Sequence, residues 1–127
     1  MDRQDLLSRV ADENIRTVRF LYCDHGNVVR GKAAHASALD DFLQSGIGLT
    51  MAMQAFTLTE HLAPGSHVGP VGEIRLVPDP RTFTVLPYAQ REARLLCDMN
   101  TLDGQPWDLC PRAFLRQTID RAAEQGL

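Results

Sequence analysis

Residues 76–112, LVPDPRTFTVLPYAQREARLLCDMNTLDGQPWDLCPR, hold the signals that decide the fold class. An apolar run at 73–77 predicts a strand, and the next two prolines end it because proline cannot donate a hydrogen bond to a sheet. A second apolar run at 93–99 predicts another strand. An Asp-Gly turn follows, and Pro111 is placed to begin a helix because its fixed φ suits the first helical position. This stretch alone therefore predicts two strands, a turn and a terminal helix.

The N-terminal third predicts a hairpin flanked by helices. Residues 15–23 are rich in β-branched and aromatic residues and alternate in polarity as a strand does. Residues 24–27 are of types that can adopt the left-handed backbone conformation of a tight turn, and residues 28–29 resume a strand. Apolar residues at helical spacing predict one helix within 2–12 and a second after Ser37, whose hydroxyl can cap it.

Two connecting segments carry weaker signals. Residues 47–56 are apolar and short of charge, and their periodicity fits either a strand or a buried coil. Residues 63–72 hold three glycines and two prolines, so we expect a loop. Strands mixed with two or three helices, hairpin first, predict an α+β domain in which a helix lies across one sheet. The last helix carries an apolar stripe of Phe114, Leu115, Ile119, Ala122 and Ala123.

The composition is that of one globular domain. With 127 residues, 44% of them hydrophobic, the chain can bury a single core. Its 13 basic residues are dispersed and its net charge is -3, which argues against a nucleic-acid partner because such binding needs a localised basic surface. No apolar run is long enough for a membrane span, and the first residues lack the apolar core of a secretion signal. We therefore expect a cytoplasmic protein whose three cysteines are reduced.

No motif in the chain is sufficient for catalysis. Residues 26–33, GNVVRGKA, nearly match the phosphate-binding loop, but Ala33 lacks the hydroxyl that would hold magnesium, and the two valines favour a strand. The four histidines lack ligand spacing, and no carboxylates cluster as phosphoryl transfer requires. No serine lies in a G-x-S-x-G context. We therefore expect no catalytic residue, no metal site and no bound ATP in this chain alone.

Several motifs, taken in their order and spacing, point to a known family. The first hairpin carries Asp24, Gly26 and Arg30-Gly31-Lys32. Residues 73–82, EIRLVPDPRT, place an acid before a proline-aspartate strand end. The last strand and helix carry Leu96-Cys97-Asp98, Asp103-Gly104, Pro106-Trp107 and Pro111-Arg112. From about Val18 to Leu127 the sequence resembles the N-terminal domain of the glutamine synthetase family.

The resemblance implies a β-grasp fold, with a mixed sheet of about four to six strands, a helix packed across it and a C-terminal connecting helix. It implies an N-terminal helix at 1–13, a β-grasp domain at 14–109, and a connection at 110–127 toward an absent catalytic domain. In that family the catalytic domain binds ATP, glutamate and Mg or Mn, and forms a γ-glutamyl amide from glutamate and ammonia or an amine. Subunits form homo-oligomeric rings, in which each N-terminal domain helps to close the active site of its neighbour. We therefore expect the chain alone to be inactive, with the catalytic domains of its own and neighbouring subunits as partners.

One departure concerns the acceptor. Ammonia-using members of the family carry an acidic Asp-Gly-Ser-Ser segment after the helix, whereas the corresponding residues 50–57, TMAMQAFT, hold no acid. A neutral, Met-containing loop suits the carbon chain of an amine better than ammonium; alternatively, the methionines are core residues and an acid elsewhere serves ammonia. The resemblance implies that Gln54 and Thr57 face the acceptor site of a neighbouring subunit. Glu73 would take the family's acidic position nearby, or be a plain surface carboxylate.

A second interpretation comes from another class of protein. The chain could be a stand-alone β-grasp module that presents a sheet edge to a partner and has no link to catalysis. An open reading frame that continues past Leu127 into paired-glutamate metal motifs would favour the ligase, and a stop codon there would favour the module.

Overall fold

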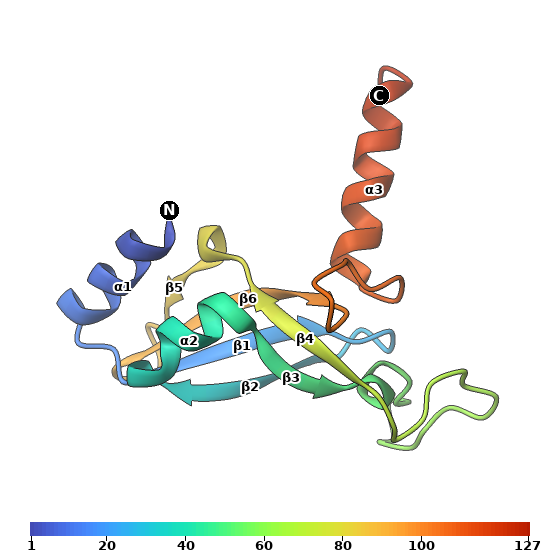
Figure 1. Cartoon of the computed structure of the whole chain (residues 1–127), viewed down its shortest axis with the longest axis horizontal. Helices are drawn as coiled ribbons and strands as arrows, with labels where there is room; N and C mark the ends of the chain where they lie inside the picture. Colours follow the sequence, from blue (N-terminus) through green and yellow to red (C-terminus); the bar gives the residue numbers. More distant parts are fainter.

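The computed structural model describes all residues from 1 to 127 and shows a curved sheet with helices over one face and a last helix that projects away (Figure 1). The helices are α1 (Arg3–Asp12), α2 (Leu39–Ser45) and α3 (Pro111–Glu124), and the short 3-10 helices are η1 (Ala36–Ala38), η2 (Met51–Gln54) and η3 (Pro80–Thr82). The strands are β1 (Thr17–Cys23), β2 (Val29–His35), β3 (Ile47–Thr50), β4 (Glu73–Pro78), β5 (Thr84–Val85) and β6 (Glu92–Asn100).

The sheet is mixed and has six strands. Its main path runs β2-β1-β6-β4-β3, and β5 pairs with β6 beside that path. β1 and β6 are parallel, with Thr17 opposite Glu92, while β1–β2, β3–β4, β4–β6 and β5–β6 are antiparallel. The hairpin predicted from strands at 15–23 and 28–29 is confirmed, with its second strand extending to His35, and so are the predicted strands before and after the two prolines. An α+β domain with a mixed sheet is therefore confirmed as well.

The core lies between the sheet and the two helices over it. β1 and β6 alternate strictly between buried and partly exposed residues, so that Phe20 and Leu95 are fully buried. From the helices, Leu6 and Leu39 join the same cluster. Arg3 of α1 hydrogen-bonds to Asp40 of α2, and the two helices lie side by side in Figure 1. The N-terminal helix is thus part of the packed core.

The segment around the second helix differs in one detail from the sequence expectation. α2 begins at Leu39, and its N-cap position, Ala38, makes no side-chain capping bond. Ser37 instead lies inside η1, where its backbone N–H donates to His35 Nδ1 at 3.2 Å. Capping by Ser37 was therefore wrong, because a 3-10 turn takes up the residues between the strand and the helix. Gly46 ends α2 with a φ of 68°, as its position predicts.

The structure also defines the two connecting segments, of which only 47–56 was left undecided by the sequence. Residues 47–50 form strand β3 and residues 51–54 form η2, so the apolar run is part strand and part turn. Residues 63–72 lie outside every helix and strand, which confirms the predicted loop. β2 and β3 are the two edges of the sheet, and Lys32 Nζ donates to the carbonyl of Gly48 across the gap between them. The sheet is thus nearly closed on itself.

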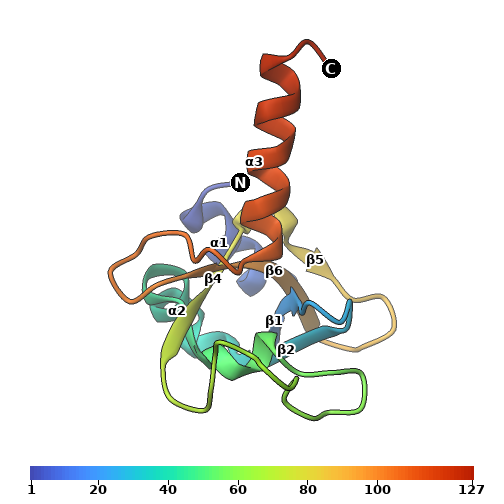
Figure 2. The ribbon, with the colours of Figure 1, turned by 90° about the vertical axis from the view of Figure 1, so that its right-hand side faces the viewer.

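Helix α3 leaves the body of the molecule, as two perpendicular views show (Figures 1 and 2). Of its residues only Ala113 is buried. Three members of its apolar stripe are largely exposed, with Phe114 at 66%, Leu115 at 57% and Ile119 at 57%. This face of α3 is therefore not covered by the rest of the chain. No helix in the structure has both the length and the apolar character that crossing a membrane requires.

Candidate functional site

The chain leaves β3 through η2, which the structure ties to the start of β4. Met51 donates its backbone N–H to the carbonyl of Gly72 at 3.2 Å. Gly72 has a φ of 112°, and a Cβ there would lie 2.7 Å from Met51 Sδ. The positive φ therefore favours glycine, because any other residue would be strained there, and a side chain would also force Met51 to move. Met51 and Met53 both pack against the core while remaining partly exposed.

Gln54 is the buried polar residue of this turn. It is 2% exposed, and its Nε2 donates to Met99 Sδ at 3.0 Å. Its Oε1 is buried and has no hydrogen-bond partner in the chain. Gln54 also lines a hollow of about 480 Å³, here called the apolar hollow, with Phe56, Val68 and Leu109 among its walls. An unpaired acceptor in such a wall lowers the stability of the fold, because a buried polar group that has lost its hydrogen bonds to water needs another partner.

Thr57 and Glu73 lie elsewhere around η2. Thr57 Oγ1 is 3.0 Å from Thr59 Oγ1 and accepts the backbone N–H of His61 at 3.3 Å, so it stabilises the tight loop after η2. Glu73 is exposed and pairs with Arg75 at 3.1 Å. It lines a second, polar hollow of about 560 Å³ together with Lys32 and Thr50. The structure thus keeps Gln54 and Thr57 in one loop and puts Glu73 in a separate hollow.

A charged cluster connects the first hairpin to the loop after η2. Arg30 Nε donates to Asp24 Oδ2 at 2.5 Å, and its Nη1 lies 3.0 Å from both oxygens of Glu60. The Arg30 guanidinium also lies over the ring of Phe56, with its carbon 5.8 Å from the ring centroid. The sequence placed Asp24 and Arg30 in the first hairpin as residues of the family resemblance, but it did not predict this cluster. The only signal available was an acid six residues before an arginine in a hairpin, which is too common to be read alone.

Asp24 is held in its charged form although it is buried. Burial alone would raise the pKa of this carboxyl, but hydrogen bonds from Arg30 and from the backbone N–H of Val28 outweigh burial and hold the pKa below its ordinary value. The Val28 bond is 2.9 Å long. The buried carboxylate is therefore a structural anchor for the hairpin and has little freedom to take up a proton.

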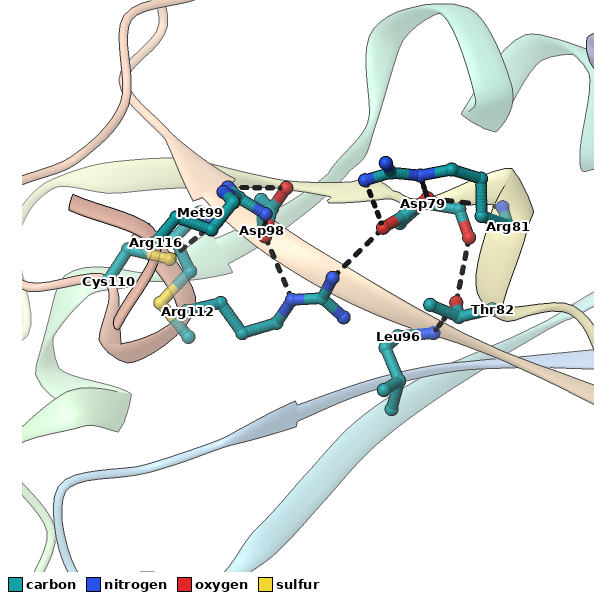
Figure 3. Close-up of polar contacts among 9 residues, drawn as sticks. All are labelled: Asp79, Arg81, Thr82, Leu96, Asp98, Met99, Cys110, Arg112 and Arg116. Atoms are coloured by element: carbon teal, nitrogen blue, oxygen red, sulfur yellow. Dashed lines mark hydrogen bonds and ion pairs between the residues drawn. The ribbon is translucent and has the colours of Figure 1, made fainter. Parts of the chain in front are cut away.

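A second charged network fixes the base of α3 (Figure 3). Asp79 pairs with Arg81 and with Arg112, each at 3.0 Å. Asp98 of β6 pairs with the same Arg112 at 3.0 Å and with Arg116 at 2.9 Å. Hydrogen bonds from Arg81 are the main reason that the pKa of Asp79 lies below its ordinary value. Because α3 buries so little apolar surface, these pairs are the main contacts that set its direction.

The chain holds no cluster of metal ligands, and the sequence that resembles a phosphate-binding loop does not fold as one. No group of three His, Cys, Asp or Glu side chains lies close enough together to hold a metal ion. Residues 26–33, which nearly match a phosphate-binding loop, form part of the hairpin turn and most of strand β2, so no helix begins at Gly31-Lys32 as that loop requires. Cys97 and Cys110 are buried free thiols, and burial raises the pKa of the Cys97 thiol to about 12.

Comparisons with known proteins agree with one another. The family model described as "Glutamine synthetase N-terminal domain" matches residues 3–107. The chain is 28% identical to the gamma-glutamylanilide synthase of Acinetobacter sp over 134 residues, which cover 95% of this chain and 27% of that protein. It is 30% identical to the glutamate–isopropylamine ligase of Pseudomonas sp over 122 residues, which cover 92% of this chain and 27% of that protein.

Solved structures give the same result. The crystal structure of a novel glutamine synthase homolog superposes on 87% of this chain and 27% of its own, with a TM-score of 0.77 and 30% identity. The chain spans about a quarter of the length of the relatives it matches. The family model nevertheless covers most of the chain. The chain therefore belongs to the glutamine synthetase family, as an N-terminal domain of that family.

Proposed function

We propose that this chain is the N-terminal domain of an ATP-dependent ligase that joins the γ-carboxyl group of glutamate to the nitrogen of an organic amine. The family match across residues 3–107 supports the ligase, and the residues around η2 support the choice of an organic amine. The chain itself has no metal-ligating cluster, so we assign ATP, glutamate and Mg or Mn to the catalytic domain of the parent enzyme. In this division of labour the chain shapes and shields the acceptor side of the active site, and alone it turns over nothing.

An organic amine fits the structure around η2 better than ammonium does. Ammonium needs a carboxylate nearby, and η2 carries none. The apolar hollow beside it offers Phe56, Val68 and Leu109 to a carbon chain, and the unpaired Oε1 of Gln54 to an N–H group. The two curated relatives described above are named for an anilide and for isopropylamine. Both observations support an amine acceptor.

Within this proposal the three site residues have different roles. Gln54 accepts a hydrogen bond from the amine, Thr57 holds the loop that places Gln54, and Glu73 contributes a negative charge beyond Thr50. Glu73 is exposed and already pairs with Arg75, so it attracts an amine less strongly than an unpaired carboxylate would. Glutamine formation from ammonia remains the competing reaction, since the family is described as glutamine synthetase.

We further propose that α3 connects the domain, at residues 110–127, to the catalytic part of the parent. Its exposed Phe114, Leu115 and Ile119 form an apolar face that a packed partner would cover. The parent would be a cytoplasmic homo-oligomeric ring, in which the surface around η2 lies against the catalytic domain of the next subunit.

The test is a comparison of two proteins under the same conditions. The full-length parent and the 127-residue chain are each incubated with glutamate, ATP, Mg and either ammonium or a panel of alkyl and aryl amines. We expect the parent to form γ-glutamyl amides and the short chain to release no phosphate from ATP. Glutamate-dependent ATP hydrolysis by the short chain would contradict the division of labour, and a parent without any ligase activity would contradict the proposed reaction.

A further inference from the structure

A third hollow lies between the two sheet edges, and Gln54 is not part of its lining. Its volume is about 400 Å³, and its lining includes Tyr22, Arg30, Lys32, Leu49, Thr50 and Met53. We call it the seam hollow, because Lys32 there reaches from β2 to the carbonyl of Gly48 on β3. It shares Lys32, Leu49 and Thr50 with the polar hollow that contains Glu73.

Two buried hydrogen-bond donors in the lining have no partner. Tyr22 is 3% exposed, and its hydroxyl finds no acceptor among the atoms of the chain. Arg30 uses Nε for Asp24 and Nη1 for Glu60, while its buried Nη2 also finds no acceptor. Buried donors in folded proteins are nearly always paired, so two unpaired donors in one lining call for a ligand that brings acceptor atoms.

The charges in the lining specify what kind of acceptor fits. The lining holds two cations, Arg30 and Lys32, and no carboxylate. Lys32 makes no ion pair within 4.0 Å, although Glu73 lines the neighbouring polar hollow with it, so its ammonium is free to pair with a bound anion. Arg30, by contrast, is already paired with two carboxylates, which neutralise its charge. Its third nitrogen can therefore donate a hydrogen bond but adds little net positive charge. One negative charge spread over two oxygens therefore suits the hollow.

The rest of the lining suits a short hydrocarbon. Leu49 is buried, and Met53 packs partly against the core. Met53 is unbranched and has three rotatable bonds, so among the lining side chains it adapts most readily to a ligand. Burial raises the pKa of Tyr22 to about 12, so its hydroxyl keeps its proton and donates at neutral pH.

We propose that the seam hollow binds a small organic carboxylate, with its two oxygens facing the Tyr22 hydroxyl, the third nitrogen of Arg30 and the Lys32 ammonium, and its carbon chain on Leu49 and Met53. This site is separate from the apolar hollow assigned to the amine and does not depend on the proposed reaction. It makes the N-terminal domain a ligand-binding unit in its own right.

The experiment is a titration of the 127-residue chain with propionate, followed by amide NMR spectra at constant ionic strength. Propionamide serves as the neutral control of the same shape. We expect saturable shifts at residues 31–32 and 49–53 with propionate, and binding of propionamide that is about tenfold weaker, because bonds to a charged acceptor are the stronger ones. Equal binding of the two compounds, or shifts that do not saturate, would overturn the proposal.

Two variants and one control assign the site. Tyr22→Phe keeps the ring and removes the hydroxyl, and Lys32→Met keeps the stem and removes the charge; each should weaken propionate binding about fivefold or more. Arg121→Gln, which removes an exposed charge on α3, should leave it unchanged. Melting temperatures check that each variant is folded. Unchanged binding by folded Tyr22→Phe, or a crystal structure in saturating propionate that shows only water between Tyr22 and Arg30, would contradict the site.

Discussion

Arg30 Nε lies 2.5 Å from Asp24 Oδ2, and this ion pair joins strand β2 to the turn that follows β1. The Asp24 side chain is completely buried, and Arg30 extends beyond it to Glu60 in the loop after η2. The position of that loop, which follows Gln54, therefore depends on a charge pair anchored in the hairpin.

Replacing Asp24 by asparagine should lower the stability of the domain and loosen the loop after η2. The variant keeps the shape but leaves the Arg30 guanidinium without its buried partner, and removing one member of a buried pair is strongly destabilising. Urea unfolding and amide exchange at residues 55–62 measure the two effects. Glu60→Gln is the matched control, because Glu60 is largely exposed and its loss should change the midpoint little. Similar midpoints for the two variants would refute this account of the hairpin.

Truncating Leu95 to alanine should destabilise the domain by about 2–5 kcal/mol, because Leu95 is fully buried in the central strand β6 and the smaller residue leaves a cavity. Leu102→Ala, at an exposed turn position, should change the free energy of unfolding by about 0.5 kcal/mol or less. Chemical denaturation gives both values. A small loss for Leu95→Ala would mean that β6 is not central to the core.

Stability should fall at acid pH in a way that depends on Asp79. Both Asp24 and Asp79 have a folded-state pKa below the ordinary value of 3.8. A lowered carboxyl pKa adds stability that is fully present above the unfolded pKa and is lost as the pH falls through the folded pKa. The urea midpoint should therefore hold steady down to about pH 5 and then drop. Asp79→Asn should make that drop shallower. An equally steep drop would contradict the attribution of acid sensitivity to Asp79.

Arg112→Met should loosen α3 while leaving the sheet intact. Arg112 is the one side chain that pairs with both Asp79 and Asp98, so its removal leaves only Arg116 joining α3 to Asp98 of β6. We expect faster amide exchange in the first turns of α3 and no change in β1 or β6. Arg121→Gln, in the last turn of the helix, is the control. Unchanged exchange in α3 would show that the charged network does not hold the helix.

The elements of this fold follow from local signals, but their arrangement does not. Alternation predicts β1, an apolar run predicts β6, and proline and glycine mark the ends of β4 and α2, because these signals act between near neighbours. The parallel pairing of Thr17 with Glu92 joins strands far apart in the chain, and no local pattern encodes it. The apolar run at 47–56 stayed undecided for the same reason, since only pairing with β4 makes its first part a strand.

The candidate site shows the same limit. Gln54, Thr57 and Glu73 were expected near an acceptor because of a family resemblance, and their roles remain a proposal. Burial of Gln54 with an unpaired oxygen could not be predicted, because it depends on Met99 from β6. The Asp24–Arg30–Glu60 cluster likewise depends on how a loop folds back over the hairpin. Side chains that meet across such distances become visible only in three dimensions.

The most direct measurement is a competition assay with the full-length parent. Glutamate, ATP and Mg are supplied with equal concentrations of ammonium and isopropylamine, and the products are quantified by mass spectrometry. Our account predicts that the γ-glutamyl amide of the organic amine is the main product, and that Gln54→Leu lowers its share relative to glutamine. Glutamine as the main product of the unmodified enzyme would contradict the account.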